Sequence, residues 1–301
     1  SLVQAIGQLD DDCELVALLD ADCVPHASWL RELAAPFADA DVAVAYGNRW
    51  YMPPDARCGS LMRYIWNVGA VGHMIWCGIP WGGTLALRRT FLDEADLAGA
   101  WSSAFCEDTM LARAAQRRGR RCVFVPSLLM VNRETCTVGS LLPWIRRQLL
   151  TVRLYHGAWP TTLAYGLASP TIVLAALAAI AWSLCLASEP SQLAALATLA
   201  VLAGLMTLRL AIVAALEITA RGVIAKRGEQ LERTSWRRCA AMPFLLAVTP
   251  FYYLAALLRA QWMRHVVWRG VQYRVDSAGK IQRLDHPAWS GSEQSESRHS
   301  L

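Results

Sequence analysis

The sequence predicts an α/β domain followed by an interfacial helix and about three transmembrane helices. Charge distribution is the first observation, because charged residues recur up to Arg153 whereas Leu154 to Ser188 contains no Asp, Glu, Lys or Arg. The second observation is that short apolar runs alternate with helical patterns in the first half, as in βαβ units. A content of 55% hydrophobic and 18% charged residues agrees, since it excludes a disordered chain and is unusual for a wholly soluble one.

The cysteine and charge counts exclude several classes of protein. The nine cysteines are scattered and no two form a Cys-x-x-Cys pair, so we expect reduced packing residues and neither a zinc site nor a disulfide framework. The net charge of +5 selects no partner class by itself. The basic cluster between Arg117 and Arg121 has no interleaved aromatic residues, which argues against nucleic acid as a partner.

The first predicted strand is the apolar run from Glu14 to Leu19, which ends in two carboxylates, Asp20 and Asp22. This is the pattern of a buried parallel strand whose C-terminal end carries ligands. Divalent cations prefer carboxylate oxygens and are shared with nucleotide phosphates, so the two aspartates suit a Mg²⁺ or Mn²⁺ ion that binds a diphosphate. A solvated turn that caps the helix after Ser28 is the alternative.

A βαβ unit follows, with a helix over Trp29–Phe37 and a second strand in the segment Asp39–Gly47. Asp39 and Asp41 form another Asp-x-Asp pair. Because this pair precedes its strand, we interpret it as a polar loop and not as a binding site.

The segment Tyr64–Leu87 contains no Asp, Glu, Lys or Arg but several glycines, which argues against a spanning helix and predicts an apolar bed at the membrane surface. Within it, the run Trp81-Gly82-Gly83-Thr84 resembles a glycine turn that enters a strand. Glycines let a ligand approach the backbone closely, so we expect the acceptor or substrate pocket here. An ordinary tight turn would contain the same residues.

Glu107 and Asp108 are predicted to open a helix that runs over Thr109–Arg118 and stops at Gly119. The helix dipole alone favours acids at this position. A carboxylate there is equally well placed to take a proton as a general base.

An amphipathic interfacial helix is expected from Leu141 to Tyr155, because tryptophan and tyrosine alternate there with arginines. Its arginines, Arg146, Arg147 and Arg153, suit either the neutralisation of a diphosphate or contact with lipid headgroups.

Three uncharged or nearly uncharged runs follow, over Thr161–Ala187, Pro190–Leu216 and Cys239–Leu258. A spanning helix needs about 20 apolar residues, so each run predicts a membrane segment. Buried helices of a large soluble protein are the alternative. Arg209 interrupts the second run and either faces a lipid phosphate or snorkels to the interface, and we favour snorkelling.

Loop charges predict the orientation of these segments. The connection Ser188–Ser191 carries no Lys or Arg, whereas the next loop is basic: Arg221, Lys226, Arg227, Arg233, Arg237 and Arg238. By the positive-inside tendency that loop and the N-terminal half face the cytoplasm. The tail arginines Arg259, Arg264, Arg269 and Arg274 conflict with three crossings, and a third segment made re-entrant by Pro243 and Pro250 removes the conflict.

Taken in order, these motifs resemble membrane glycosyltransferase family 2, and within it ceramide glucosyltransferase and its bacterial relatives. The resemblance runs from Ser1 to about Arg283 and is carried by Asp20-Ala-Asp22, Trp81-Gly-Gly-Thr84, Glu107-Asp108, Arg118-Gly119, Arg147-Gln-Leu-Leu-Thr151 and Trp268-Arg-Gly-Val-Gln-Tyr-Arg274.

The resemblance implies a partial type-A glycosyltransferase (Rossmann-like) domain. It also implies a UDP-sugar donor, a divalent metal, and inverting transfer of a hexose, with glucose expected, to the hydroxyl of a membrane lipid such as ceramide. Asp20 and Asp22 match the family's metal-binding aspartates. Asp108 matches its catalytic base, with Glu107 beside it, and Arg146, Arg147 and Arg153 are the candidate ligands of the donor diphosphate.

The chain departs from the family pattern at two places. The family's Q/R-x-x-R-W motif corresponds to Arg147–Thr151, with leucine and threonine in place of Arg and Trp, or in another register places Arg147 on the motif's second arginine. The family also begins with a membrane helix and a nucleotide-binding βα portion. Ser1–Ile6 resembles the helix after that portion, so we expect the chain to lack this N-terminal part.

The predicted organisation has four parts: a cytosolic catalytic domain over residues 1–140, an interfacial helix over 141–160, transmembrane helices over 161–258 and a basic tail over 259–301. The chain is expected to be an integral membrane protein. A processive polysaccharide synthase, or a non-catalytic membrane protein or transporter, are the alternative functions.

Overall fold

The computed structural model describes residues 2–186, 188–229, 231, 235–268, 270–276 and 279–285. Its N-terminal part is built on a four-stranded mixed sheet in the order β1-β3-β2-β4. The strands are β1 (Leu15–Leu19), β2 (Val42–Tyr51), β3 (Thr84–Arg88) and β4 (Arg121–Asn132). Arg233, Arg269 and the last part of the tail, 286–301, lie outside the described residues.

The strand β1 differs from the prediction of a buried parallel strand. It pairs antiparallel with β3, which in turn pairs antiparallel with β2, and it lies at the edge of the sheet. Of its five residues only Val16 is buried. The strand that begins at Thr84 is inserted between the two halves of the predicted βαβ unit, so β1 and β2 run in the same direction without being neighbours.

Helices cover both faces of this sheet. Alternate residues of β2 and β3 point to opposite faces. On one face Tyr46, Leu85 and Leu87 pack among residues of α1 (Leu2–Ile6), α4 (Arg89–Glu94), α5 (Leu97–Trp101) and α6 (Leu111–Gln116). On the other face Ala45 and Ala86 pack with Leu33 of α2 (Trp29–Ala34) and Phe37 of the 3₁₀ helix η1 (Ala35–Ala38). The result is a three-layer α/β domain.

The uncharged segment after Tyr64 lies largely in one helix, α3 (Cys58–Cys77), which continues through Gly69 and Gly72 and ends where Gly78 adopts a left-handed conformation. It packs with α7 (Val138–Tyr155) and α10 (Trp236–Gln261) through a cluster that includes Leu61, Leu141 and Leu257. As expected from its glycines, α3 is not among the described helices that are long and apolar enough to cross a membrane.

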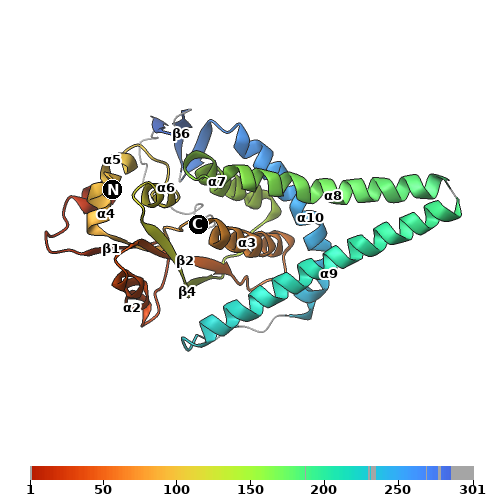
Figure 1. Ribbon diagram of the computed structural model, residues 1–301, viewed down its shortest axis with the longest axis horizontal. Helices are drawn as coiled ribbons and strands as arrows, with labels where there is room; N and C mark the ends of the chain where they lie inside the picture. Colours follow the sequence, from red (N-terminus) through yellow and green to blue (C-terminus); the bar gives the residue numbers. More distant parts are fainter. Residues whose placement is uncertain are drawn as a thin grey trace, which may run out of the picture.

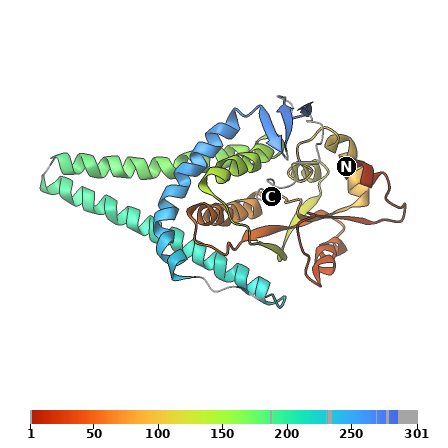
Figure 2. The ribbon, with the colours of Figure 1, turned by 180° about the vertical axis from the view of Figure 1, so that it is seen from behind.

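Three of the described helices are long and apolar enough to cross a membrane: α8 (Trp159–Leu186), α9 (Glu189–Ala225) and α10. Figures 1 and 2 show α8 and α9 as a hairpin that projects away from the rest of the molecule, with α10 passing its base. Pro243 and Pro250 lie inside α10, and the helix continues through both. The prolines therefore do not break the third segment as a re-entrant loop would require.

The basic tail forms a sheet that was not predicted from the sequence, with antiparallel strands β5 (His265–Trp268), β6 (Val271–Val275) and β7 (Ile281–Asp285). It is joined to the N-terminal domain by hydrogen bonds. The Ile281 N–H donates to the Ser103 carbonyl (2.8 Å). The Tyr155 hydroxyl accepts from the Phe105 N–H (2.8 Å) and donates to the Gly279 carbonyl (2.6 Å). These bonds fix the tail sheet to the α/β domain.

Candidate active site

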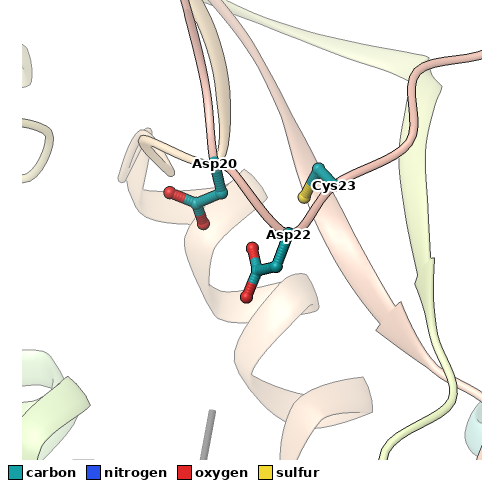
Figure 3. Close-up of side chains that lie close together, drawn as sticks. All are labelled: Asp20, Asp22 and Cys23. Atoms are coloured by element: carbon teal, nitrogen blue, oxygen red, sulfur yellow. The ribbon is translucent and has the colours of Figure 1, made fainter. Parts of the chain in front are cut away.

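The loop after β1 brings two carboxylates and a thiol together. Ligand atoms of Asp20, Asp22 and Cys23 lie within 4.8 Å of one another, and Figure 3 shows both carboxylates directed to the same side of the loop. Burial, and then the charges of Asp20 and Asp22, raise the pKa of Cys23 to about 11, so the thiol keeps its proton. The two exposed carboxylates remain as oxygen ligands, which fit the Mg²⁺ or Mn²⁺ expected from the sequence.

The glycine turn of residues 81–84 lies against this loop and leads directly into β3. The Asp20 N–H donates to the Gly83 carbonyl (3.3 Å), which ties the turn to the acidic loop. Thr84 is fully buried, and its hydroxyl accepts a hydrogen bond from the Trp29 indole (2.7 Å), so its role is to position the turn. Trp81 is the member of the turn that lines the large cavity described below.

Gly82 permits a close approach between the turn and the second acidic pair. Its N–H donates to Asp108 Oδ2 at 2.8 Å. A Cβ at this position would lie 2.2 Å from Glu107 Oε1, closer than any real side-chain contact. A side chain at this position would displace the Glu107 carboxylate and crowd Asp108 Cβ, and a glycine avoids both.

Glu107 and Asp108 precede a helix, but not as its first residues. The helix α6 begins at Leu111 and ends at Gln116, whereas the prediction was Thr109–Arg118. Asp108 instead bonds the backbone around it, since its Oδ1 accepts from the Thr109 N–H (2.5 Å) and its Oδ2 from Gly82. Gly119 has the left-handed φ of 65° expected of a helix stop.

The two acids are placed in different environments. Burial raises the pKa of both, and the charge of Asp108 raises the pKa of Glu107 further. Two backbone N–H groups, from Gly82 and Thr109, oppose this shift in Asp108 because they favour its ionised form. These donors therefore favour ionisation of Asp108, and the charge of Asp108 in turn favours the protonated form of Glu107. A charged and a neutral carboxyl side by side is a common arrangement of catalytic acids and bases.

Asp108 opens on a cavity of about 640 Å³. From the α/β domain it is lined by Arg49, Trp81 and Asp108, and its wall continues over α3 and α7 to residues of α8, α9 and α10 such as Tyr165, Val213 and Tyr253. Most of the lining side chains are apolar. The cavity thus joins a buried carboxylate to the base of the membrane hairpin.

Arg209 is one of the few charged residues in the wall of this cavity. Its guanidinium donates to the Ser169 hydroxyl (2.7 Å) instead of extending away along α9. The sequence favoured snorkelling for this arginine and did not predict its bond to α8. The geometry fits the other expectation, a residue that faces a polar group of a lipid.

The predicted diphosphate arginines do not line the cavity within the described part of the chain. Arg153 donates to the carbonyls of Ala260 (2.6 Å), Gln261 (2.5 Å) and Met263 (2.8 Å), and so caps the end of α10. Arg146 donates to the Met263 sulfur (3.2 Å). Arg147 is on the same helix, α7, and is likewise absent from the cavity wall.

Arg49 is a further cation of the site, and it was not predicted from the sequence. The predicted strand stopped at Gly47, but β2 continues to Tyr51 and carries Arg49 into the cavity wall. The charge of Arg49 lowers the pKa of Cys23, in opposition to burial, which places Arg49 beside the acidic loop. An arginine at the end of an otherwise apolar strand was the signal available in the sequence.

Comparison with known families agrees with this arrangement. Residues 13–281 match the family model described as Glycosyl transferase family 21. This is a narrower assignment than the family 2 label drawn from the motifs. A search of the curated proteins gave no significant match. The match spans most of the chain, from the acidic loop through the membrane helices to β7, and the chain belongs to glycosyl transferase family 21.

Proposed function

We propose that the protein is an inverting glycosyltransferase that transfers a hexose, with glucose as the expected sugar, from a UDP-sugar to the hydroxyl group of a membrane lipid. A single observation carries the proposal: the partly buried carboxylate of Asp108 opens on a largely apolar cavity that continues between the membrane helices. A ceramide-like lipid, with its hydroxyl next to its hydrocarbon chains, has the shape and polarity that such a cavity accepts.

Asp108 is the general base of the proposed reaction. The lipid hydroxyl attacks the anomeric carbon from the face opposite the diphosphate and gives its proton to Asp108 Oδ as the new C–O bond forms. The bond from the anomeric carbon to the diphosphate oxygen breaks, and its electron pair leaves with UDP. The hydrogen bonds from Gly82 and Thr109 hold the carboxylate in one orientation before the proton arrives.

Asp20 and Asp22 would hold the divalent metal together with the donor diphosphate. When bound, the metal supplies positive charge that neutralises the leaving diphosphate. The two carboxylates fit this role because both are exposed on the loop after β1 and are directed to one side.

The cavity favours a lipid acceptor over a growing polysaccharide. A polymer of sugars needs hydroxyl-bonding groups along its path, whereas most side chains in this wall are apolar. Membership of a glycosyltransferase family likewise disfavours a transporter. We retain lipid glycosylation as the proposal, with one sugar added per acceptor.

We further propose that the α/β domain faces the cytoplasm and that only α8 and α9 cross the membrane. The basic loop after α9 supports this orientation, and its Arg227 donates to the carbonyls of Ser127 (3.1 Å) and Leu129 (2.7 Å) on β4. The following helix, α10, packs against α3 and α7 over much of its length and leads into the tail sheet on the same domain. If α8 and α9 cross the membrane and α10 does not, the basic loop and the tail sheet both lie on the side of the α/β domain, as their contacts with it require. In this arrangement α10 lies at the membrane surface.

The proposal predicts that membranes containing the protein, given UDP-glucose, Mg²⁺ and a lipid extract, form lipids heavier by one hexose. Mass spectrometry of the lipids with and without the protein checks this, and chelation of the metal is expected to abolish the product. A ladder of products that differ by successive hexoses would instead indicate a polysaccharide synthase. Complete absence of transfer with every nucleotide sugar would contradict an enzymatic role.

Replacement of the base is expected to separate chemistry from binding. Asp108→Asn should lower kcat by about 10²–10⁴-fold and leave the affinity for UDP unchanged, because proton transfer alone is lost. Glu107→Gln should lose far less, since glutamine resembles a protonated glutamate. In the unmodified enzyme kcat/KM should fall with decreasing pH from a point above the pKa of an ordinary aspartate, about 3.9, because burial raises the pKa of Asp108. Equal losses of kcat and UDP affinity in Asp108→Asn would show that this residue is structural.

A larger side chain in the cavity should weaken binding of the acceptor and leave binding of the donor unchanged. Gly72 on α3 lines the cavity and has no atom within 4 Å of an added Cβ, so Gly72→Leu fits the helix and occupies the cavity. We expect the acceptor KM to rise about ten-fold or more with the donor KM unchanged. Gly204→Leu is the matched control, because Gly204 on α9 has the same free space but does not line the cavity. The same KM shift in both variants would count against the cavity as the acceptor site.

Reporter fusions test the orientation. A fluorescent protein fused after Leu301 should fluoresce and alkaline phosphatase at the same point should be inactive, since both results report the cytoplasm. Alkaline phosphatase inserted between Leu186 and Glu189, where α8 and α9 meet, should be active. Phosphatase activity at Leu301 would show that α10 crosses as well.

A further inference from the structure

One arginine beside the acidic loop, Arg49, is held by aromatic rings and a side-chain amide. The guanidinium carbon of Arg49 lies 5.3 Å from the ring centroids of both Trp81 and Trp144, and its Nη2 donates to Gln148 Oε1 at 2.9 Å. Among the described residues, it has no ion pair with a carboxylate within 4.0 Å. These two indoles and the amide hold the guanidinium in one orientation. All three groups are neutral, so they do not neutralise its charge.

A second arginine nearby shows what a structural role looks like. Arg63 also lies over an aromatic ring, 4.3 Å from the centroid of Tyr51, but it forms an ion pair with Glu134 (3.2 Å) and bonds the Glu134 carbonyl. It is buried, with 4% of its side chain exposed, and it does not line the cavity. Arg49 shares the aromatic contacts of Arg63, lacks the carboxylate, and does line the cavity. The difference indicates that a ligand supplies the negative charge.

The position of Arg49 identifies the kind of ligand. On one side its guanidinium lies over Trp81, in the turn whose Gly83 carbonyl accepts the Asp20 N–H. On the other side it shares the cavity wall with Asp108 and Trp81. When the sugar is presented to the acceptor, the donor diphosphate must lie between the proposed metal ligands and the proposed base. Arg49 lies beside that position.

The altered family motif supports the same assignment. In the register that aligns Arg147 with the first position of the motif, Leu150 and Thr151 stand where the motif has Arg and Trp. Neither supplies a cation: Leu150 is fully buried in one cluster with Met263, and the Thr151 hydroxyl donates to the Gln148 carbonyl (2.8 Å). Gln148, from this same segment, is the residue that binds Arg49. In that register, the Arg49 guanidinium and the Trp144 indole therefore lie beside the segment in which leucine and threonine replace the motif's Arg and Trp.

We propose that Arg49 binds the diphosphate of the nucleotide-sugar donor and stabilises it as it leaves. This inference rests on the proposed function. As the bond between the anomeric carbon and the diphosphate oxygen breaks, the electron pair remains on that oxygen, and the guanidinium of Arg49 offsets the charge that develops there. The proton of the acceptor hydroxyl goes to Asp108, so Arg49 exchanges no proton.

The test compares three variants of the full chain. Arg49→Gln removes the charge, Arg49→Lys retains it without the planar guanidinium, and Arg57→Gln is the control, because Arg57 is a domain arginine with 68% of its side chain exposed. The measurements are the Kd for UDP in the presence of Mg²⁺ and the kcat for transfer, with a thermal unfolding curve for each variant. Loss of a transition-state cation of this type costs on the order of 10²–10³-fold in kcat.

We expect Arg49→Gln to lose kcat by that factor and to bind UDP at least ten-fold more weakly, Arg49→Lys to lie between it and the unmodified enzyme, and Arg57→Gln to match the latter. In a fourth variant, Arg49→Ala, added guanidinium ion should partly restore kcat, a result that a packing defect would not give. Unchanged UDP affinity and kcat in Arg49→Gln, with a normal unfolding curve, would overturn the inference. If the unmodified protein binds UDP but transfers no sugar, the proposed function fails while the UDP affinity of Arg49→Gln still tests Arg49.

Discussion

The hydrogen bond between the Gly82 N–H and Asp108 joins two segments on which the rest of the site depends. It sets the glycine turn against the acidic pair, and the absent side chain of Gly82 makes the approach possible. The same turn bonds the Asp20 N–H through the Gly83 carbonyl and continues into β3, the strand between β1 and β2. Asp20, Asp22, Glu107 and Asp108 come from distant parts of the chain, yet one backbone turn contacts both pairs. The cost of burying a carboxylate is offset here by two backbone N–H groups.

The site is coupled to the membrane helices through the strand that carries Arg49. Its neighbour Trp50 is buried, and the Trp50 indole donates to Glu217 Oε2 on α9 (2.8 Å). The Tyr64 hydroxyl of α3 donates to the same oxygen (3.1 Å), while Arg221 pairs with the other oxygen (2.6 Å). One carboxylate thus joins α9 to both β2 and α3. Arg49 and Trp50 are adjacent in β2. The hydrogen bond from Trp50 to Glu217, which holds α9 against β2, therefore also helps to position Arg49, the proposed ligand of the donor.

The motifs proposed to carry the chemistry could be identified from the sequence, whereas the strands and side chains around them could not. Asp20 with Asp22, the glycine turn and Glu107 with Asp108 were identified from local pattern, because each motif lies within a stretch of two to four residues whose spacing alone marks it. The neighbour of β1 was predicted wrongly, since strand order depends on a segment more than 60 residues further along the chain. Arg49 was missed because the glycine at position 47 suggested a strand end, although Gly47 is required by the close approach of Leu128 and the strand continues. The tail sheet was missed because its strands are short and mix charged with apolar residues.

Water exclusion connects the membrane helices to the chemistry. A base that takes the proton of the acceptor hydroxyl can equally take one from water, and water at the anomeric carbon would hydrolyse the donor instead of allowing transfer. The apolar side chains that α3, α8, α9 and α10 contribute to the cavity occupy the space that water would fill, and a lipid hydrocarbon chain completes this wall when the acceptor binds. A bound lipid acceptor therefore helps to form the active site in which it reacts. A soluble alcohol, which leaves the cavity wet, should for that reason be a poor acceptor even though its hydroxyl is chemically equivalent.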